Sequence, residues 1–272
     1  MVRPATMIVQ TDAHVRLDPE PRDMLYDRAV ARLPDPKRDL FMGQMGKDIF
    51  NKIEINCFQV LLDNKDEGDA KAGSHLGCYP EISRFNHDCR PNLHYRINNI
   101  THTTVAARDI APGEELSISY IGQMHTREER MTRLRRWGFN CTCAQCAMSD
   151  KEAAASDARL RTIEKLEADL GIFNETLVTA ETGAELVRLY EEEHLHIYLA
   201  QALTRAALNF ALFGQTERAR EYAREAAEAM DREVGPHSLD AKSMRLLAEN
   251  PKAHWTWGKR RGGRRRSGKG TP

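Results

Sequence analysis

The chain has 272 residues, enough for a substantial core and for more than one structural unit. Lys plus Arg and Asp plus Glu number 40 each, so no overall charge points to nucleic acid or to a membrane surface. No apolar run approaches the roughly 20 residues of a membrane-spanning helix, and the N-terminus has no signal-peptide core. We therefore expect an intracellular protein whose six cysteines are thiols or metal ligands rather than disulfides.

The N-terminal part of the chain combines strand and helix patterns. A short apolar run over Thr6–Gln10 predicts a strand. Apolar spacing predicts amphipathic helices over Glu20–Leu33 and Arg38–Phe50, separated at Pro34, which interrupts helical structure. The segment Ile53–Leu62 is β-rich and partly alternating, so we expect it to form a strand.

The middle of the chain predicts a β-hairpin followed by a further strand. His94–Ile97 and Thr101–Ala107 have the pattern of antiparallel strands, joined by a turn at Asn98-Asn99. After a Pro-Gly turn at residues 112–113, Leu116–Tyr120 is expected to form another strand.

The rest of the chain is predicted to be mainly helical. A capping-box signature begins a helix over about Thr126–Trp137, and helical spacing continues from Cys146 almost to Asn250. Two helices separated at Gly214 resemble one tetratricopeptide-like hairpin, although an ordinary helical domain explains the pattern equally well. The Gly-rich basic segment Lys259–Lys269 is expected to be a disordered tail.

Three cysteines lie within six residues: Cys141, Cys143 and Cys146. Thiolates are soft ligands that suit Zn²⁺, which prefers four of them in a tetrahedron. The fourth ligand is left open by spacing, because Cys57, Cys78, Cys89 and several histidines are all available. The alternative to a zinc site is a group of unrelated buried thiols.

Three motifs resemble, in the same order, those of SET-domain protein methyltransferases. Asn86–Asn92, with the sequence NHDCRPN, is similar to the family signature Asn-His-Ser-Cys-x-Pro-Asn, with Asp88 in place of the usual serine. Gly113–Tyr120 (GEELSISY) resembles the second motif, whose last residue is the active-site tyrosine. Cys141–Cys146 resembles the post-SET zinc module.

The resemblance covers roughly Met1 to Cys146. Ile55–Phe58 and Gly77–Ser83 further resemble the subgroup that includes the SET-and-MYND methyltransferases, and the helical C-terminal region suits that subgroup. The implied fold class is α+β: a partial SET-type β fold with short sheets and inserted helices, a zinc module, and an all-α C-terminal region. The implied domains are a SET domain (1–122), a post-SET module (123–148), a helical domain (149–250) and a basic tail (251–272).

The resemblance also implies roles for individual residues, with S-adenosyl-L-methionine and Zn²⁺ as cofactors. Tyr120 would be the catalytic residue. The residues expected to contact the cofactor are Asn56, Asn86, His87, Tyr120 and Phe139, with Asn86 and His87 acting chiefly through amide and backbone hydrogen bonds. Tyr79 and Trp137 are expected to line the substrate channel, with core packing as the alternative for Trp137. The expected zinc ligands are Cys89, Cys141, Cys143 and Cys146.

The family's first motif, a Gly-x-Gly strand pair, is not found in the sequence, and neither is a MYND cysteine-histidine cluster. Val2–Gln10 resembles the strand that normally follows the glycine motif, so we expect an N-terminally truncated SET domain. The resemblance therefore implies an S-adenosylmethionine-dependent protein-lysine N-methyltransferase with a histone or non-histone substrate. The alternative is a catalytically impaired, SET-derived interaction scaffold held together by zinc.

The expected partners are a protein substrate with a target lysine and a protein that docks on the helical domain, without a membrane. The basic tail is expected to contact nucleic acid only non-specifically, and it has the composition of a nuclear-localisation signal or a solvated tail. We expect a nuclear or cytoplasmic location, or both.

Overall fold

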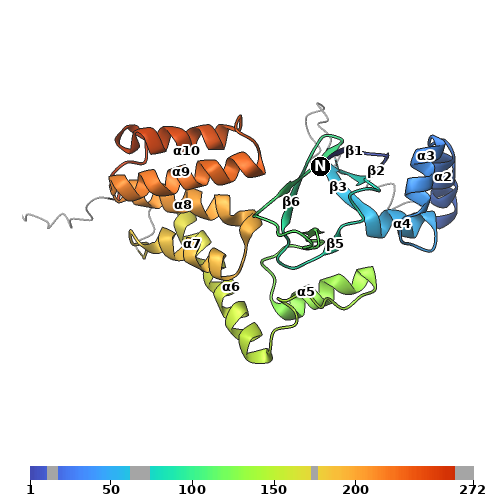
Figure 1. Cartoon of the computed structure of the whole chain (residues 1–272), viewed down its shortest axis with the longest axis horizontal. Helices are drawn as coiled ribbons and strands as arrows, with labels where there is room; N and C mark the ends of the chain where they lie inside the picture. The colour runs from blue at the N-terminus through green and yellow to red at the C-terminus, as the bar shows by residue number, and fades with distance from the viewer. Residues whose placement is uncertain (11–17, 62–73, 173–176, 261–272) are drawn as a thin grey trace, which may run out of the picture. The chain divides into compact units, whose positions relative to one another are not determined.

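The computed structural model describes residues 1–10, 18–61, 74–172 and 177–260, and the chain divides into two compact units (Figure 1). The first unit comprises Met1–Gly122 and Glu128–Cys146, and the second comprises Gln123–Arg127 and Ala147–Pro272. The cysteines at residues 141–146 thus belong to the same unit as the strands that precede them. Residues 261–272 of the predicted basic tail lie outside the described part of the chain.

Within the described residues, the strands of the first unit form three small sheets. The first sheet is antiparallel, in the order β1 (Val2–Pro4), β7 (Thr101–Ala106) and β6 (Leu93–Asn98). The second is also antiparallel, in the order β2 (Met7–Gln10), β4 (Ser74–Cys78) and β3 (Cys57–Leu61). The third is a parallel pair of two-residue strands, β5 (Asn86–His87) and β8 (Ser117–Ile118). Short sheets combined with helices confirm the predicted α+β class.

The predicted β-hairpin is confirmed, with each strand boundary within one residue of the expected one. Its turn contains Asn99, whose φ of 49° lies in the left-handed region that asparagine tolerates better than most residues. Alternation along β7 buries His102 and Thr104 on one face, which is the period-2 pattern of a half-buried strand. The strand predicted over Leu116–Tyr120 is shorter in the structure, because only the two residues of β8 pair.

The predicted helix over Arg38–Phe50 is wrong, because the structure divides it in two. After α2 (Pro19–Ala31), α3 (Asp35–Met42) ends before Gly46, whose φ of 129° is rarely adopted by residues with a side chain. A Cβ atom at Gly46 would lie 2.7 Å from the backbone nitrogen of Lys52, so the chain turns back sharply there. Asp48 then caps α4 (Ile49–Asn56), since its side chain accepts a hydrogen bond from the Asn51 N–H at 2.7 Å.

The strand predicted over Ile53–Leu62 is wrong for its first four residues, which form the last turn of α4 before β3 begins at Cys57. Ile53 is completely buried in a hydrophobic cluster that includes Tyr26 and Phe41. This packing of helix on helix overrides the local β preference, because an apolar run of this length fits either periodicity.

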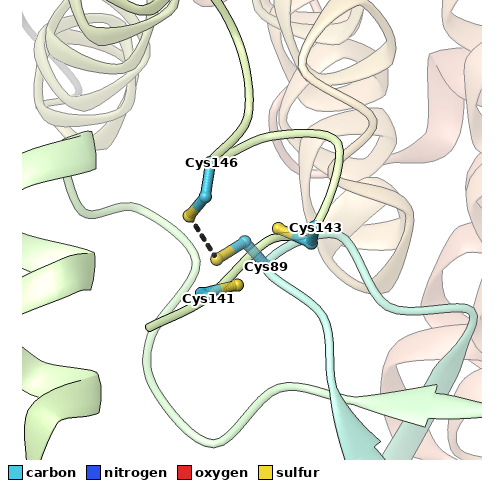
Figure 2. Close-up of side chains that lie close together, drawn as sticks. All are labelled: Cys89, Cys141, Cys143 and Cys146. Carbon is cyan, nitrogen blue, oxygen red and sulfur yellow. Dashed lines mark hydrogen bonds between the residues drawn. The ribbon is translucent and has the colours of Figure 1, made fainter. Parts of the chain in front are cut away.

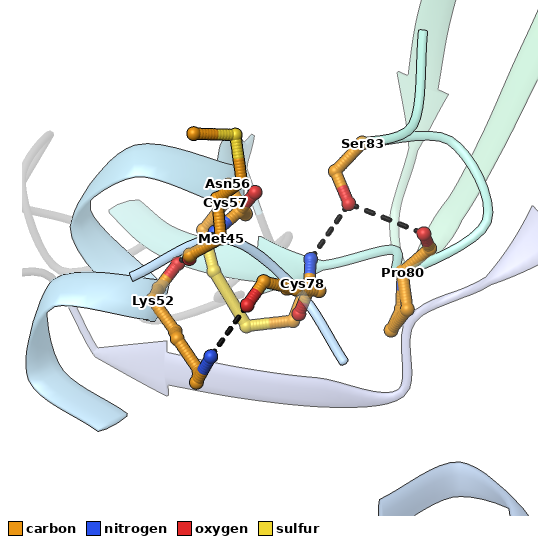
Figure 3. Close-up of a disulfide and its surroundings, with 8 residues drawn as sticks. Met45, Lys52, Asn56, Cys57, Cys78, Pro80 and Ser83 are labelled. Carbon is orange, nitrogen blue, oxygen red and sulfur yellow. Dashed lines mark hydrogen bonds between the residues drawn. A yellow bond between two sulfur atoms is a disulfide. The ribbon is translucent and has the colours of Figure 1, made fainter. Parts of the chain in front are cut away.

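Cys57 and Cys78 lie directly opposite each other in the β3–β4 register and form a disulfide (Figure 3). Their Cα atoms are 4.6 Å apart, the close spacing of a non-hydrogen-bonded antiparallel pair. The expectation that all six cysteines are thiols or metal ligands is therefore wrong for this pair. Strand pairing joins two residues 21 positions apart, which spacing along the chain does not reveal.

The last helices of the first unit are α5 (Arg127–Leu134) and the 3₁₀ turn η1 (Arg135–Trp137), and the unit continues to Cys146. Arg127, the first residue of α5, belongs to the second unit. The regular elements of the second unit in its described part are helices: α6 (Asp150–Gly171), α7 (Thr182–Glu192), α8 (Leu199–Leu212), α9 (Thr216–Glu233) and α10 (Leu239–Glu249), with 3₁₀ turns η2 (His196–Tyr198) and η3 (Pro251–Ala253). Among the described residues, none of the helices combines the length and the apolar character needed to cross a membrane.

Small residues allow the helices of the second unit to approach closely. The predicted helix break at Gly214 is confirmed, since its φ of 71° ends α8 and lets α9 begin. A Cβ atom at Gly183 of α7 would lie 2.6 Å from the Cα of Ala206 in α8. The completely buried alanines of α8 and α9 are Ala202, Ala206, Ala207, Ala211, Ala219, Ala223 and Ala226. The tetratricopeptide-like character of this unit remains a prediction.

Candidate functional site

Figure 2 shows four cysteine side chains that converge from two segments: Cys89, which follows β5, and Cys141, Cys143 and Cys146, which follow η1. Their four sulfur atoms all lie within 4.8 Å of one another, and the Cys89 and Cys146 sulfurs are 3.5 Å apart. In a tetrahedral site with Zn–S bonds of about 2.3 Å, the sulfurs are about 3.8 Å apart, so small shifts would suffice to bind the ion. Of the candidates for a fourth ligand, Cys89 joins the other three.

The charges of these sulfurs depend on one another. Burial raises the pKa of the Cys141 thiol to about 12. Hydrogen bonding with Cys143 raises the pKa of Cys89, whereas hydrogen bonds from Cys146 and Cys89 lower the pKa of Cys143. Hydrogen bonding within the cluster thus favours a thiolate at Cys143, while four thiolates so close together would repel one another unless a cation lay between them. Four converging thiolate donors fit Zn²⁺ well.

The helix before the cysteines holds this cluster in place. Leu134 of α5 is completely buried in the hydrophobic cluster that contains Cys89 and Cys141. Arg130, also in α5 and 1% exposed, donates a hydrogen bond from Nη2 to the Gln145 carbonyl at 3.4 Å. Trp137, the last residue of η1, donates from Nε1 to the Ile55 carbonyl at 3.0 Å, which fixes its ring against the end of α4.

Asn92 connects the segment after β5 to the segment before β8. Its Nδ2 donates to Glu114 Oε1 and to the Glu115 carbonyl, both at 2.8 Å, and its Oδ1 accepts from the Ser117 N–H at 3.0 Å. Arg108 forms an ion pair with Glu114, and these hydrogen bonds lower the pKa of Glu114 to about 2. Asn92 is only 2% exposed, and the bond that it accepts from the Ser117 N–H is buried. The turn before β8 is thereby held in register with β5.

Tyr120 lies two residues after β8, at the centre of an aromatic group. Its hydroxyl donates to the Phe85 carbonyl at 2.7 Å. The ring centroids of His87, Trp137 and Phe139 lie 5.3, 5.4 and 6.4 Å from that of Tyr120. Burial raises the pKa of the Tyr120 hydroxyl above its ordinary value, so the group is protonated at neutral pH. Phe139 is 37% exposed and presents part of its ring to solvent.

Asn86 and His87 form the strand β5 and make different contacts. The Asn86 side-chain amide donates to Glu115 Oε1 at 2.6 Å, near the surface. His87 accepts the Tyr120 backbone N–H at Nδ1, at 3.0 Å, and its Nε2 lies 3.2 Å from the Cys89 sulfur. Burial lowers the pKa of His87 to about 4, so the ring is neutral at physiological pH.

The other predicted site residues make local contacts. The Asn56 side chain donates to the carbonyls of Met45 and Lys52, both at 2.8 Å, at the end of α4 (Figure 3). Tyr79 is completely buried in a different hydrophobic cluster from that of Tyr120, and its hydroxyl donates to the Ile100 carbonyl at 3.2 Å. Burial raises the pKa of Tyr79 to about 12. The roles expected for Asn56 and Tyr79 remain predictions.

The sequence patterns predicted no role for Asn92, Arg108, Glu114 or Glu115, although all but Arg108 lie inside the motifs Asn86–Asn92 and Gly113–Tyr120. The hydrogen bonds of Asn92 with Glu114 and of Asn86 with Glu115 join residues 22 and 29 positions apart, and Arg108 supports Glu114 from six positions away. The proline before Asn92 and the turn before Glu114 are local signals for bends, but they do not say that the two bends meet.

Comparisons with known proteins find a family match within the first unit. Residues 3–121 match the SET domain family. The chain is 36% identical to the histone-lysine N-methyltransferase SMYD3 of Homo sapiens over 125 residues, which is 46% of this chain and 26% of that protein. It is 27% identical to the N-lysine methyltransferase SMYD2 of Sus scrofa over 156 residues, 56% of this chain and 35% of that protein. The match to SMYD2-B of Danio rerio is 31% over 117 residues, 43% of this chain and 26% of that protein. The chain thus matches about a quarter to a third of the length of these relatives.

Proposed function

We propose that this chain, whose residues 3–121 form a SET domain like those of the SMYD lysine methyltransferases, is an S-adenosylmethionine-dependent protein-lysine N-methyltransferase. The observation that carries the proposal is the position of Tyr120. The residue is half-buried with its ring among three other aromatic rings, and its hydroxyl is oriented by the Phe85 carbonyl. The segment that carries it runs next to the four-cysteine cluster, which we propose holds one Zn²⁺.

The residues around Tyr120 suit a cofactor with a planar adenine and polar groups. Phe139 offers a partly exposed ring on which an adenine can stack, 6.2 Å from the ring of His87. Asn86 is exposed, and its amide nitrogen already donates to Glu115, so its Oδ1 is oriented to accept a hydrogen bond from a ligand. When bound, S-adenosylmethionine would supply an electrophilic methyl group on its sulfonium sulfur.

Tyr120 would then orient the attacking amine. Because its hydroxyl proton is donated to the Phe85 carbonyl, the oxygen lone pairs are left to accept a hydrogen bond from a substrate amine. The lysine must reach the site without its proton, which costs roughly 4 to 5 kcal/mol at pH 7 from an ordinary pKa of about 10.4. The aromatic walls reduce this cost because an apolar environment disfavours the ammonium form. Transfer forms the N–C bond as the S–C bond breaks, so alignment is the chief task of the protein.

The proposed partner is a protein substrate that presents a lysine. We also propose that the helical second unit docks a protein partner, and that the basic residues 259–269 direct the chain to the nucleus. Deleting residues 259–272 and locating the protein by microscopy tests the proposed nuclear targeting: loss of nuclear signal supports it, and an unchanged distribution contradicts it.

The function is tested by cofactor binding and by methyl transfer. Calorimetry with S-adenosylmethionine is expected to give one binding site, and tritium from the labelled methyl group is expected to appear on lysine in a protein acceptor. Phe139→Leu should weaken cofactor binding by about 10-fold or more through loss of stacking, whereas Phe139→Tyr keeps the ring and should bind normally. Absence of cofactor binding in zinc-loaded protein would contradict the proposal and favour a non-catalytic interaction scaffold.

A further inference from the structure

His87 occupies a position between the metal centre and the Tyr120 segment. It is the second residue of β5, and its backbone pairs with Ile118 of β8. Its side chain bridges two other groups: Nδ1 lies 3.0 Å from the Tyr120 backbone nitrogen, and Nε2 lies 3.2 Å from the Cys89 sulfur. Both ring nitrogens are therefore used within the protein.

These contacts fix the position of the ring proton. A backbone N–H can only donate, so Nδ1 of His87 must accept from Tyr120 and cannot carry a proton. A neutral imidazole then carries its proton on Nε2 and donates it to the Cys89 sulfur. A metal-bound cysteine is a thiolate, which can only accept a hydrogen bond, so metal binding strengthens the bond that His87 already makes.

We propose that His87 is a positioning residue that couples the four-cysteine metal centre to the backbone of Tyr120. The coupling rests on the proposed function only in the use that it assigns to the Tyr120 hydroxyl. Tyr120 lies two residues beyond β8, a strand of only two residues. It is held at two points: its N–H donates to His87, and its hydroxyl donates to the Phe85 carbonyl. Metal binding orders Cys89, the Cys89 thiolate orders the His87 ring, and the ring holds the Tyr120 backbone.

The coupling matters because β8 is too short to fix Tyr120 by strand pairing. A displacement of about 1 Å at a reacting group can lower the rate of a reaction by about 100-fold. Because both nitrogens of its ring are engaged, His87 would contact a cofactor through its backbone rather than its side chain. His87 and Asn86 therefore have different roles: the His87 side chain acts within the protein, whereas the Asn86 side-chain amide lies near the surface.

Nuclear magnetic resonance tests the coupling in the wild-type protein without any activity measurement. The ¹⁵N shifts of the His87 ring should show the proton on Nε2 in zinc-loaded protein. Removing zinc with a chelator should speed hydrogen exchange at the Tyr120 amide. The Ser117 amide is the internal control, because it donates to Asn92 Oδ1 at 3.0 Å rather than to the His87 ring. A proton on Nδ1, or equal acceleration at both amides, would overturn the proposal.

Two substitutions test separately the contact of His87 with the Tyr120 N–H and its contact with the Cys89 sulfur. His87→Asn places an oxygen near the Nδ1 position, so it should keep the Tyr120 amide protected while zinc affinity falls by about 10- to 100-fold in a chelator competition. His87→Gln places an N–H₂ group near the Nε2 position, so it should keep zinc affinity while the Tyr120 amide exchanges faster. Identical effects of both substitutions on both readouts would contradict the assignment.

The same variants distinguish the coupling from the proposed function. If the wild-type protein transfers methyl groups, His87→Gln should lower kcat while the KM for S-adenosylmethionine stays unchanged. An inactive protein that still shows the Nε2 proton and the chelator effect would contradict the proposed function and support the coupling. Equal losses of cofactor binding and turnover in His87→Gln would instead show that the ring acts on the cofactor, against the proposal.

Discussion

Asn92→Ala is the substitution that we expect to disrupt the candidate site most without touching Tyr120 or the cysteines. It removes three hydrogen bonds, to Glu114, to the Glu115 carbonyl and from the Ser117 N–H. Each contributes about 1 kcal/mol, and a buried donor left unpaired, here the Ser117 N–H, costs about 1–3 kcal/mol. The two lost bonds to Glu114 and Glu115 and the unpaired Ser117 N–H should therefore together lower the free energy of unfolding of the first unit by about 3–5 kcal/mol.

Native-state hydrogen exchange is the suitable assay, because amides in β6 and β7 report on the first unit without a contribution from the second. Asn98→Ala is the matched control: Asn98 is exposed at the end of β6, and its truncation should change stability by less than about 0.5 kcal/mol. If Asn92→Ala lowers stability by no more than the control does, the assigned connection between the two motifs is wrong.

Three further predictions concern burial, the disulfide and the metal. The pKa of the fully buried His102 is lowered by burial from 6.5 to about 4, so the unfolded chain binds a proton first as the pH falls. The contribution of His102 to the free energy of unfolding is therefore complete above pH 6.5 and is lost between pH 6.5 and 4, by about 3 kcal/mol in all. Denaturant unfolding of His102→Phe should lack this part of the pH dependence. Reducing the Cys57–Cys78 disulfide should destabilise the first unit by about 3 kcal/mol, because it closes a loop between residues 21 positions apart; unchanged exchange rates in β3 and β4 would argue against this. Cys143→Ser should lower bound zinc from about one ion per chain to well below one in elemental analysis, and full retention would remove Cys143 from the ligand set.

Features that depend on neighbouring residues could be predicted from the sequence. The β6–β7 hairpin and the break at Gly214 follow from local turn residues, and both are confirmed. The cysteine cluster is a mixed case. Spacing alone groups Cys141 with its two neighbours, but only the family resemblance added Cys89, which the structure brings within 4.8 Å of them.

Features that depend on contacts between distant segments could not be predicted. The turn at Gly46 needs a φ value that a helical apolar pattern does not reveal. The residues from Ile53 to Asn56 are helical rather than extended because α4 packs on α3 and α2. The Cys57–Cys78 disulfide arises from the register of β3 and β4. The Asn92 bonds likewise join two loops that meet only in the folded chain.

The central claim, that Tyr120 is the catalytic residue of a lysine methyltransferase, is tested most directly by Tyr120→Phe. The measurement pairs calorimetric binding of S-adenosylmethionine with transfer of its labelled methyl group to a protein acceptor. The account predicts that the variant binds the cofactor like the wild-type protein while transfer falls by about 100-fold or more, because the hydroxyl oxygen that orients the amine is gone. Transfer at the wild-type rate in Tyr120→Phe would contradict the account.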